Sequence, residues 1–146
     1  MDFIKLTNDE IKRLRNLSEY GYQFDWTKKS SDISEIVAFQ HDGNITGLVE
    51  FERRATSKLN YMWLIEVADE HKGTGVSGKL LAYVGRDSLE AGFEGFVLFE
   101  SKSYLYEYYI KAFNAKPVRG RLLMFDTETT TQLIDTYLKE ENLYEK

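Results

Sequence analysis

The sequence predicts a mixed α/β fold, with helices flanking a central sheet whose strands are mostly antiparallel. Strand-like segments follow one another in the first half of the chain, and strand and helix patterns alternate in the second half. Hydrophobic residues make up 42% of the chain and aromatic residues 14%, which excludes a disordered protein because so much apolar surface can form a core. The length of 146 residues is typical of one domain, so we expect residues 1–146 to fold as a single unit.

The N-terminal region predicts a strand, a capped helix and then a less regular segment. Residues 3–6 form a short apolar run that indicates a strand. Thr7 is a suitable N-cap for the next helix, because Glu10 follows three residues later as in a capping box. The buried face of this helix is marked by Ile11, Leu14 and Leu17. Residues 21–32 have no clear periodicity, which favours a loop or a short helix.

Three further strands are expected before the middle of the chain. Residues 36–39 lead through Asp42-Gly43, a frequent hairpin turn pair, into residues 45–51. Residues 59–67 are apolar on both faces, which is typical of a strand in the centre of a sheet.

The second half of the chain alternates between helices and strands. One helix face is marked by Val76, Leu80, Leu81 and Val84, and another by Leu105, Tyr108, Tyr109 and Ala112. Residues 96–99 and 121–125 are expected to be strands. A last helix over residues 127–141 is appended to this core, and it either packs on the sheet or forms the contact of a homodimer.

Charge and residue types exclude several classes of function. The chain has 19 Lys and Arg against 24 Asp and Glu, a net charge of −5, and its low pI argues against a nucleic-acid-binding protein. An acidic chain instead suits a cationic substrate or partner. Without cysteine, disulfides, thiolate metal sites and cysteine nucleophiles are excluded. No apolar run approaches the roughly 20 residues that span a bilayer, so we expect a cytoplasmic protein without a membrane partner.

A glycine-rich turn follows the central strand and is the most informative segment of the sequence. A polar linker after Val67 leads to Gly73, Gly75 and Gly78, where a helix begins. Backbone N–H groups at the start of a helix have no partner in the helix and bind anions such as phosphates, and glycines let the anion approach closely. The alternative is a loop that binds no anion, followed by a helix whose first turn contains glycines.

One phosphate-binding interpretation is a nucleotide-binding loop. Residues 73–79 match the first seven positions of the pattern GxxxxGK. The eighth position is Leu80, however, which has no hydroxyl to hold Mg²⁺, and residues 68–72 separate the strand from the first glycine. A P-loop-like nucleotide binder is therefore the weaker alternative.

The second interpretation is a resemblance to a known family. The segment Lys72-Gly73-Thr74-Gly75-Val76-Ser77 is similar to the motif (Gln/Arg)-x-x-Gly-x-(Gly/Ala), which follows a strand ending in valine in the GNAT superfamily of acyl-CoA-dependent N-acetyltransferases. Lys72 and Ser77 depart from that motif, and Ser77 is small enough to keep the close backbone approach. The resemblance extends from the 42–47 hairpin to Phe125 and implies a GNAT-like fold.

The resemblance implies how acetyl-CoA, the co-substrate, would bind, without any metal. The backbone of Ile65 to Val67 would pair with the pantetheine arm, and an amide near Ile65 would donate to the thioester carbonyl. The pyrophosphate would be held by backbone N–H groups of Lys72, Gly73, Thr74, Gly75, Val76, Ser77 and Gly78.

The resemblance also suggests catalytic residues. Tyr109 occupies the position of the family's tyrosine acid. Tyr108 is the alternative candidate for the acid, because the turn after this helix lies one residue later than usual. Glu50 and Glu66, on neighbouring strands, are the candidates for the base that accepts the amine proton. The amine pocket is expected to be lined by Phe24, Trp26, Glu50 and Glu52.

These inferences lead to one function and one rival of another class. We expect an enzyme, an N-acetyltransferase in which a primary amine directly attacks acetyl-CoA in a ternary complex. The amine belongs to a small molecule or to a peptide or protein, and the sequence does not choose between them. The rival is a catalytically inactive acyl-CoA-binding sensor or partner module, which the departures at Lys72, Ser77 and Lys102 favour.

Overall fold

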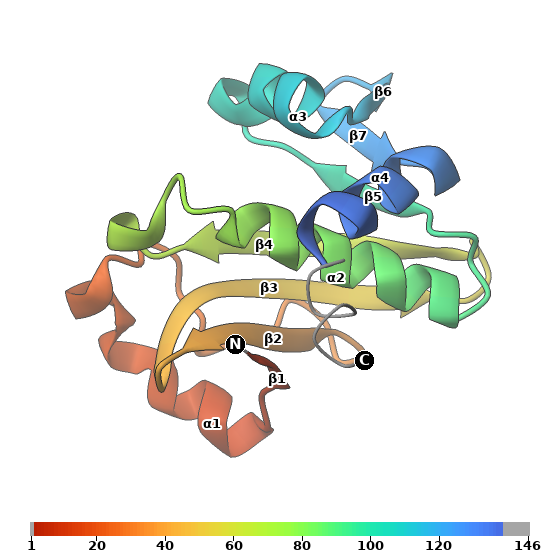
Figure 1. Ribbon diagram of the computed structural model, residues 1–146. Coiled ribbons are helices and arrows are strands. Elements are labelled where there is room, and N and C mark those ends of the chain that lie inside the picture. Colours follow the sequence, from red (N-terminus) through yellow and green to blue (C-terminus); the bar gives the residue numbers. More distant parts are fainter. Residues whose placement is uncertain (1, 139–146) are drawn as a thin grey trace, which may run out of the picture.

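The computed structural model describes residues 2–138, apart from the side chains of residues 2, 15 and 16. Within these residues a seven-stranded sheet has the order β1-β2-β3-β4-β5-β7-β6. Its strands are β1 (Asp2–Lys5), β2 (Glu35–His41), β3 (Asn44–Arg54), β4 (Leu59–Val67), β5 (Val97–Glu100), β6 (Lys116–Arg119) and β7 (Leu122–Phe125). The β4–β5 pair is parallel and the other pairs are antiparallel, which confirms the predicted mixed α/β fold (Figure 1).

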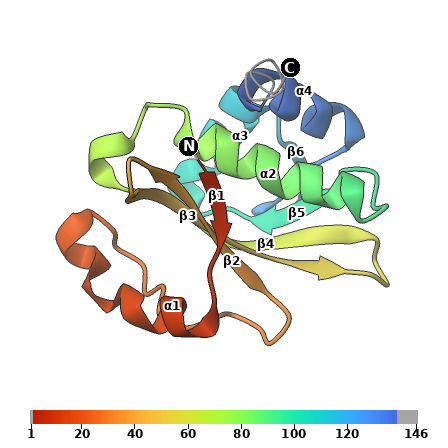
Figure 2. The ribbon, with the colours of Figure 1, turned by 60° about the horizontal axis from the view of Figure 1, so that its bottom comes forward.

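Helices cover both faces of the sheet. The α-helices are α1 (Asn8–Lys12), α2 (Val76–Glu90), α3 (Tyr106–Phe113) and α4 (Thr127–Tyr137), and the 3₁₀ helices are η1 (Arg13–Tyr20), η2 (Asp69–His71) and η3 (Ser103–Leu105). Figure 2 shows α1 on one side of the sheet, with α2 and α4 on the other. No helix among residues 2–138 combines the length and the apolar character needed to cross a membrane.

The local signals of the N-terminal half have the structural effects that were predicted. The side-chain oxygen of Thr7 accepts from the N–H of Glu10 at 3.2 Å, and the Glu10 carboxylate accepts from the N–H of Thr7 at 3.0 Å. The turn between β2 and β3 has φ values of 53° at Asp42 and 81° at Gly43, as a hairpin of this type requires. The predicted N-terminal helix is only partly α-helical, because it continues as η1.

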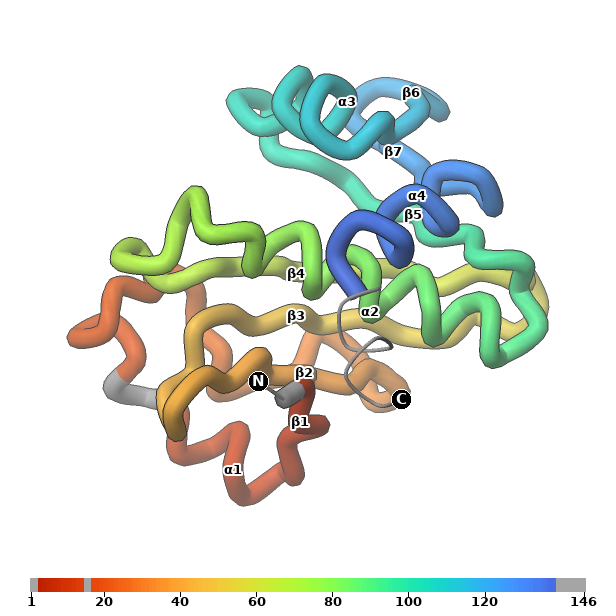
Figure 3. The backbone as a smooth tube through the Cα atoms, in the orientation of Figure 1, coloured from red at the N-terminus to blue at the C-terminus, as the bar shows by residue number. Residues whose placement is uncertain are grey.

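The central feature of the sheet is the separation of β4 from β5. These strands pair only where residues 60–62 lie beside residues 97–99, and Figures 1 and 3 show them diverging beyond that point. The same place has a shift in the β3–β4 register, where Glu50 pairs with Leu64 but Phe51 pairs with Met62. Trp63 is therefore an extra residue in β4, and such a bulge bends its strand. The C-terminal half of β4 is consequently open on the side of β5.

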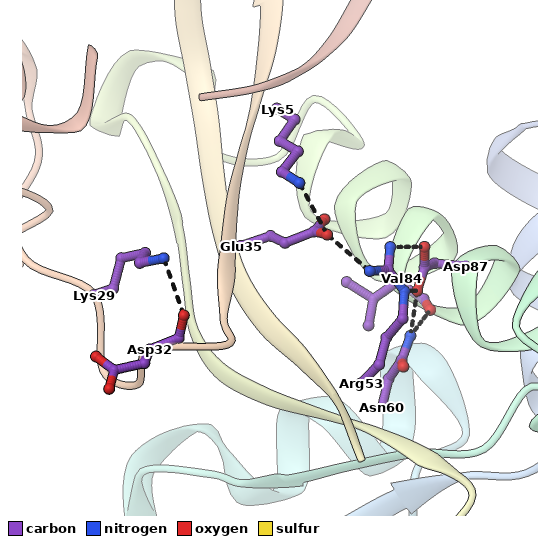
Figure 4. Close-up of polar contacts among 8 residues, drawn as sticks. All are labelled: Lys5, Lys29, Asp32, Glu35, Arg53, Asn60, Val84 and Asp87. Atoms are coloured by element: carbon purple, nitrogen blue, oxygen red, sulfur yellow. Dashed lines mark hydrogen bonds and ion pairs between the residues drawn. The ribbon is translucent and has the colours of Figure 1, made fainter. Parts of the chain in front are cut away.

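Helix α2 is fixed against the sheet near both of its ends. Near its start, a Cβ atom at Gly47 of β3 would lie 2.7 Å from Val76 and 2.8 Å from Leu80, so only glycine permits this close approach. Near its end, the Arg53 guanidinium donates to Asp87 at 2.6 and 2.9 Å (Figure 4). These contacts and those with Glu35 raise the pKa of Arg53.

The C-terminal helix α4 packs on α2. The ring of Tyr137 lies against Gly78, and Thr130 lies against Gly85, where an added Cβ would be 2.6 Å from a Thr130 methyl carbon. The predicted last helix reached residue 141, and residues 139–141 lie outside the described part of the chain. Packing of α4 on α2 therefore depends on glycines that leave room for side chains of α4.

This packing predicts the effect of adding one methyl group at Gly78. A Cβ there would overlap the Tyr137 ring, so Gly78→Ala should lower the free energy of unfolding by about 1–3 kcal/mol. In a Tyr137→Ala background the same change should instead stabilise by about 1 kcal/mol, because alanine favours helix more than glycine. Urea unfolding of the four variants measures both effects, and stabilisation by Gly78→Ala alone would contradict the packing.

Candidate functional site

A pocket of about 360 Å³ lies where β4 separates from β5. Its walls come from the segment after η1, the open part of β4, the loop before α2, the start of α2, and α3 with the turn that precedes it. They are Gln23, Phe24, Ile65, Glu66, Val67, His71, Lys72, Gly73, Val76, Ser77, Tyr104, Leu105, Tyr108 and Tyr109. A smaller hollow of about 50 Å³ shares Phe24, Ile65, Leu105 and Tyr109 with it. We call these the main pocket and the side hollow.

The loop before α2 presents unpaired backbone N–H groups at one end of the main pocket. Gly73 and Gly75 have φ values of 82° and 90°, which glycine adopts without strain. The N–H groups of Gly73 and of residues 75–78 make no hydrogen bond with any residue between 2 and 138. They lie at the positive end of the 15-residue helix α2, so this amide cradle is suited to an anion such as a diphosphate.

Side chains of the same loop hold its shape. The Thr74 hydroxyl donates to the carbonyl oxygen of His71 at 2.5 Å. Lys72 lies 2.8 Å from the Asp69 carboxylate, and this contact raises the pKa of Lys72. Of the predicted cofactor-binding residues, Thr74, Gly75 and Gly78 do not line the main pocket, although Gly75 and Gly78 belong to the amide cradle.

The open edge of β4 faces the main pocket with the backbone of alternate residues. Ala68 donates its N–H to Thr46 of β3 at 3.0 Å. Backbone groups alternate in direction along an antiparallel strand, so those of Ile65 and Val67 point away from β3. Both residues line the main pocket, where β5 no longer pairs with them. An extended amide-containing chain could therefore pair with this edge.

Tyr109 lies at the junction of the main pocket and the side hollow. Its side chain is 7% exposed and its ring centroid lies 5.0 Å from that of Phe99. Its hydroxyl makes no hydrogen bond with any described residue. Burial, with smaller effects of Tyr108 and Tyr104, raises the pKa of Tyr109 to about 12, so the phenol keeps its proton at neutral pH. Tyr108 lines the main pocket but is 48% exposed.

Glu66 lines the main pocket, and its carboxylate is already engaged. One oxygen accepts from the N–H of Gln23 at 2.6 Å, and the other accepts from the N–H of Phe24 at 3.1 Å and the indole N–H of Trp26 at 2.8 Å. The Glu66 carboxylate thus fixes the segment that carries Phe24 into the pocket wall.

Glu50 does not line either cavity. It is fully buried on the face of the sheet under residues 22–34, where it accepts from the N–H and hydroxyl of Ser30 at 2.5 and 2.7 Å and from Ser34 at 2.6 Å. Glu52 accepts from Trp63 at 2.5 Å and Arg54 at 2.9 Å. Like Glu66, these carboxylates anchor neighbouring structure.

The predicted amine pocket needs correction, because of its four residues only Phe24 lines the main pocket or the side hollow. Trp26 is 1% exposed and belongs to the core, and Glu50 and Glu52 are buried. Residues 22–34 pack over these side chains, which strand periodicity alone could not indicate. The lining residues that were not assigned to a site include Gln23, Trp63, Tyr104, Leu105 and Lys102. Lys102, Tyr104 and Leu105 follow the end of β5, a position that could have indicated a site, whereas nothing in the sequence singled out Gln23 or Trp63.

Comparison with known proteins supports the fold at low sequence identity. No family model and no curated protein matches the sequence. Tetrahymena Gcn5 is 13% identical, with a TM-score of 0.64, over 87% of this chain and 96% of its own. A spermidine N-acetyltransferase chimera of Vibrio cholerae SpeG and hSSAT is 12% identical, with a TM-score of 0.65, and the match covers 90% of this chain and 99% of the chimera. An acetyltransferase of the GNAT family from Staphylococcus aureus is 11% identical, with a TM-score of 0.59, and the match covers 86% of this chain and 98% of that protein.

The bonds of Glu66 predict a structural effect of Glu66→Gln. An amide has one acceptor oxygen where the carboxylate has two, so at least one of the three N–H donors would lose its partner. We expect the free energy of unfolding to fall by about 2–3 kcal/mol, with faster proteolysis within residues 22–34. Glu70→Gln is the matched control, because the Glu70 side chain is 77% exposed. Unchanged stability in Glu66→Gln would contradict the anchoring role.

Proposed function

Since the chain has the fold of GNAT acetyltransferases, we propose that it is an N-acetyltransferase that transfers the acetyl group of acetyl-CoA to a primary amine. One observation carries this proposal. The amide cradle, the open edge of β4 and Tyr109 border the same pocket. An anion site, a strand edge and a proton donor are what a diphosphate-linked thioester requires of a protein.

The chemistry of the main pocket fits the co-substrate. Its anion-binding end suits the diphosphate, and the backbone of Ile65 and Val67 suits the amides of the pantetheine arm. The apolar side chains of Val76 and Leu105 suit the hydrocarbon parts of that arm. Acetyl-CoA would supply the acetyl group as an activated thioester.

Tyr109 serves as the acid in this mechanism. As the amine nitrogen bonds to the acetyl carbon, the carbon–sulfur bond breaks and the sulfur takes a proton from the Tyr109 hydroxyl. Water restores the proton to Tyr109. A phenol with a raised pKa is protonated before the step, and its hydroxyl has no competing partner among the described residues.

Proton removal from the amine is assigned to water at the mouth of the pocket. Glu66 already accepts three hydrogen bonds and Glu50 lies outside both cavities. We therefore assign the two carboxylates to positioning of residues 22–34. The direct route, without a covalent enzyme intermediate, also agrees with the absence of cysteine from the sequence.

An acyl-CoA-binding module without catalysis is the second candidate. Lys72, which replaces the family's Gln or Arg, is paired with Asp69, so its charge is partly compensated. Both candidates share the binding site, and amine-dependent release of free CoA separates them. A nucleotide site of the P-loop type has no support, because Leu80 is fully buried and brings no hydroxyl to Mg²⁺.

The proposal predicts separate effects on binding and turnover. Calorimetric titration should give saturable binding of acetyl-CoA and none of ATP with Mg²⁺. Tyr109→Phe should lower kcat about 100-fold or more while acetyl-CoA affinity changes little, because only the proton donor is lost. Tyr106→Phe is the control, since Tyr106 is on the same helix but lines neither cavity. Unchanged kcat in Tyr109→Phe would remove Tyr109 from the mechanism.

The pKa of Tyr109 also predicts a pH profile. Because the pKa of Tyr109 is about 12, its phenol keeps its proton and can act as the acid across the neutral and mildly alkaline pH range. The fraction of neutral amine rises with pH over the same range, so kcat/KM should rise and then level off. A fall of kcat/KM on the mildly alkaline side, in a protein that stays folded, would contradict a protonated Tyr109 with this pKa.

A further inference from the structure

The side hollow is the place from which an acceptor amine would approach, if the proposed function holds. It shares Ile65 and Tyr109 with the main pocket, so it adjoins the residues proposed to bind the thioester and to act as the acid. Its remaining walls are Met62, Trp63, Leu64, Phe99, Glu100, Ser101 and Lys102, with Phe24 and Leu105 also shared. Most of this surface is apolar, which suits an acceptor with an apolar body.

The carboxylates around the side hollow already have hydrogen-bond or ion-pair partners. Glu66 accepts three hydrogen bonds, and Glu52 accepts from Ser31, Trp63 and Arg54. Glu100, on the wall itself, lies 3.5 Å from the guanidinium of Arg121. A cationic acceptor would therefore have to compete with existing partners for each of these charges.

Lys102, unlike these carboxylates, is a charged residue without an ion-pair partner among the described residues. It belongs to the wall of the side hollow, and no carboxylate of a described residue pairs with its ammonium group. The ammonium instead lies 4.0 Å from the ring centroid of Phe24, which also forms part of the wall. A cation–π contact at an exposed site is weak, so the flexible side chain can exchange it for an anion.

We propose that the acceptor is a primary amine that also carries an anionic group, and that Lys102 binds this group. The net charge of the chain, −5, would favour a cation at long range. Exposed charges are screened beyond about 8 Å at physiological ionic strength, so the nearest uncompensated charge decides local preference. Of the two charged residues on the wall of the side hollow, Glu100 has Arg121 as an ion-pair partner and Lys102 has no carboxylate partner among the described residues, so the ammonium of Lys102 would attract an anion and repel a second cation.

Three probes with one scaffold test this preference: para-(aminomethyl)benzoate, its carboxamide and para-(aminomethyl)benzylamine. Each has a primary amine on an aromatic body, and the opposite end is anionic, neutral or cationic. We expect kcat/KM to be about tenfold higher for the benzoate than for the carboxamide, and lowest for the diamine. Lys102→Glu should reverse the order. Lys111→Glu, an exposed change on α3 away from both cavities, should keep it.

Failure of this inference and failure of the proposed function are distinguishable. Acetyl transfer with the diamine preferred, or with the order unchanged in Lys102→Glu, would overturn the role of Lys102 and leave the enzyme function intact. If no probe is acetylated, NMR-detected binding of the same probes to the CoA-saturated protein measures the preference without turnover. Tighter binding of the benzoate, lost in Lys102→Glu, would then support the anion site. Equal binding of all three probes would overturn it.

Discussion

The main pocket exists because β4 separates from β5 after Met62. Two strands that stayed paired would satisfy each other's backbone groups and leave no space between them. The extra residue Trp63 bends β4 at this point, and the backbone of Ile65 and Val67 is then left facing the main pocket. The pocket is thus a consequence of sheet geometry, and the groups proposed to bind the co-substrate are mainly backbone atoms. Such a site tolerates much variation of side chains, which agrees with a shared fold at very low sequence identity.

One ligand can bind both the open edge of β4 and the amide cradle only if the cradle is held at a fixed distance from that edge. Close packing at Gly47 holds the start of α2, and Arg53 with Asp87 holds its last turn. Packing of Tyr137 on Gly78 adds α4 to this arrangement, just beside the cradle. A ligand that binds both the cradle and the edge of β4 therefore meets groups that are already placed, and less ordering entropy opposes its binding.

Local sequence signals predicted the elements well, and tertiary packing explains what they missed. Asp42-Gly43 and the glycine-rich turn work through backbone conformation, which neighbouring residues determine, so the hairpin and the start of α2 were found. Strand β6 was missed because it is a short edge strand with Pro117 and exposed side chains. The surroundings of Glu50 could not be predicted, because alternation along a strand says which face a side chain occupies but not which segment covers it. Lys102 was noted only as a departure from a motif, since its uncompensated charge is a property of the folded protein.

One ligand should occupy both the amide cradle and the open edge of β4, and an amide-resolved NMR titration with CoA would detect this joint occupancy. The N–H signals of Gly73, residues 75–78, Ile65 and Val67 should shift together and saturate at one ligand concentration, while those of α1 stay unchanged. Saturating CoA that leaves the cradle and β4 signals in place, or that shifts only signals elsewhere in the chain, would contradict it.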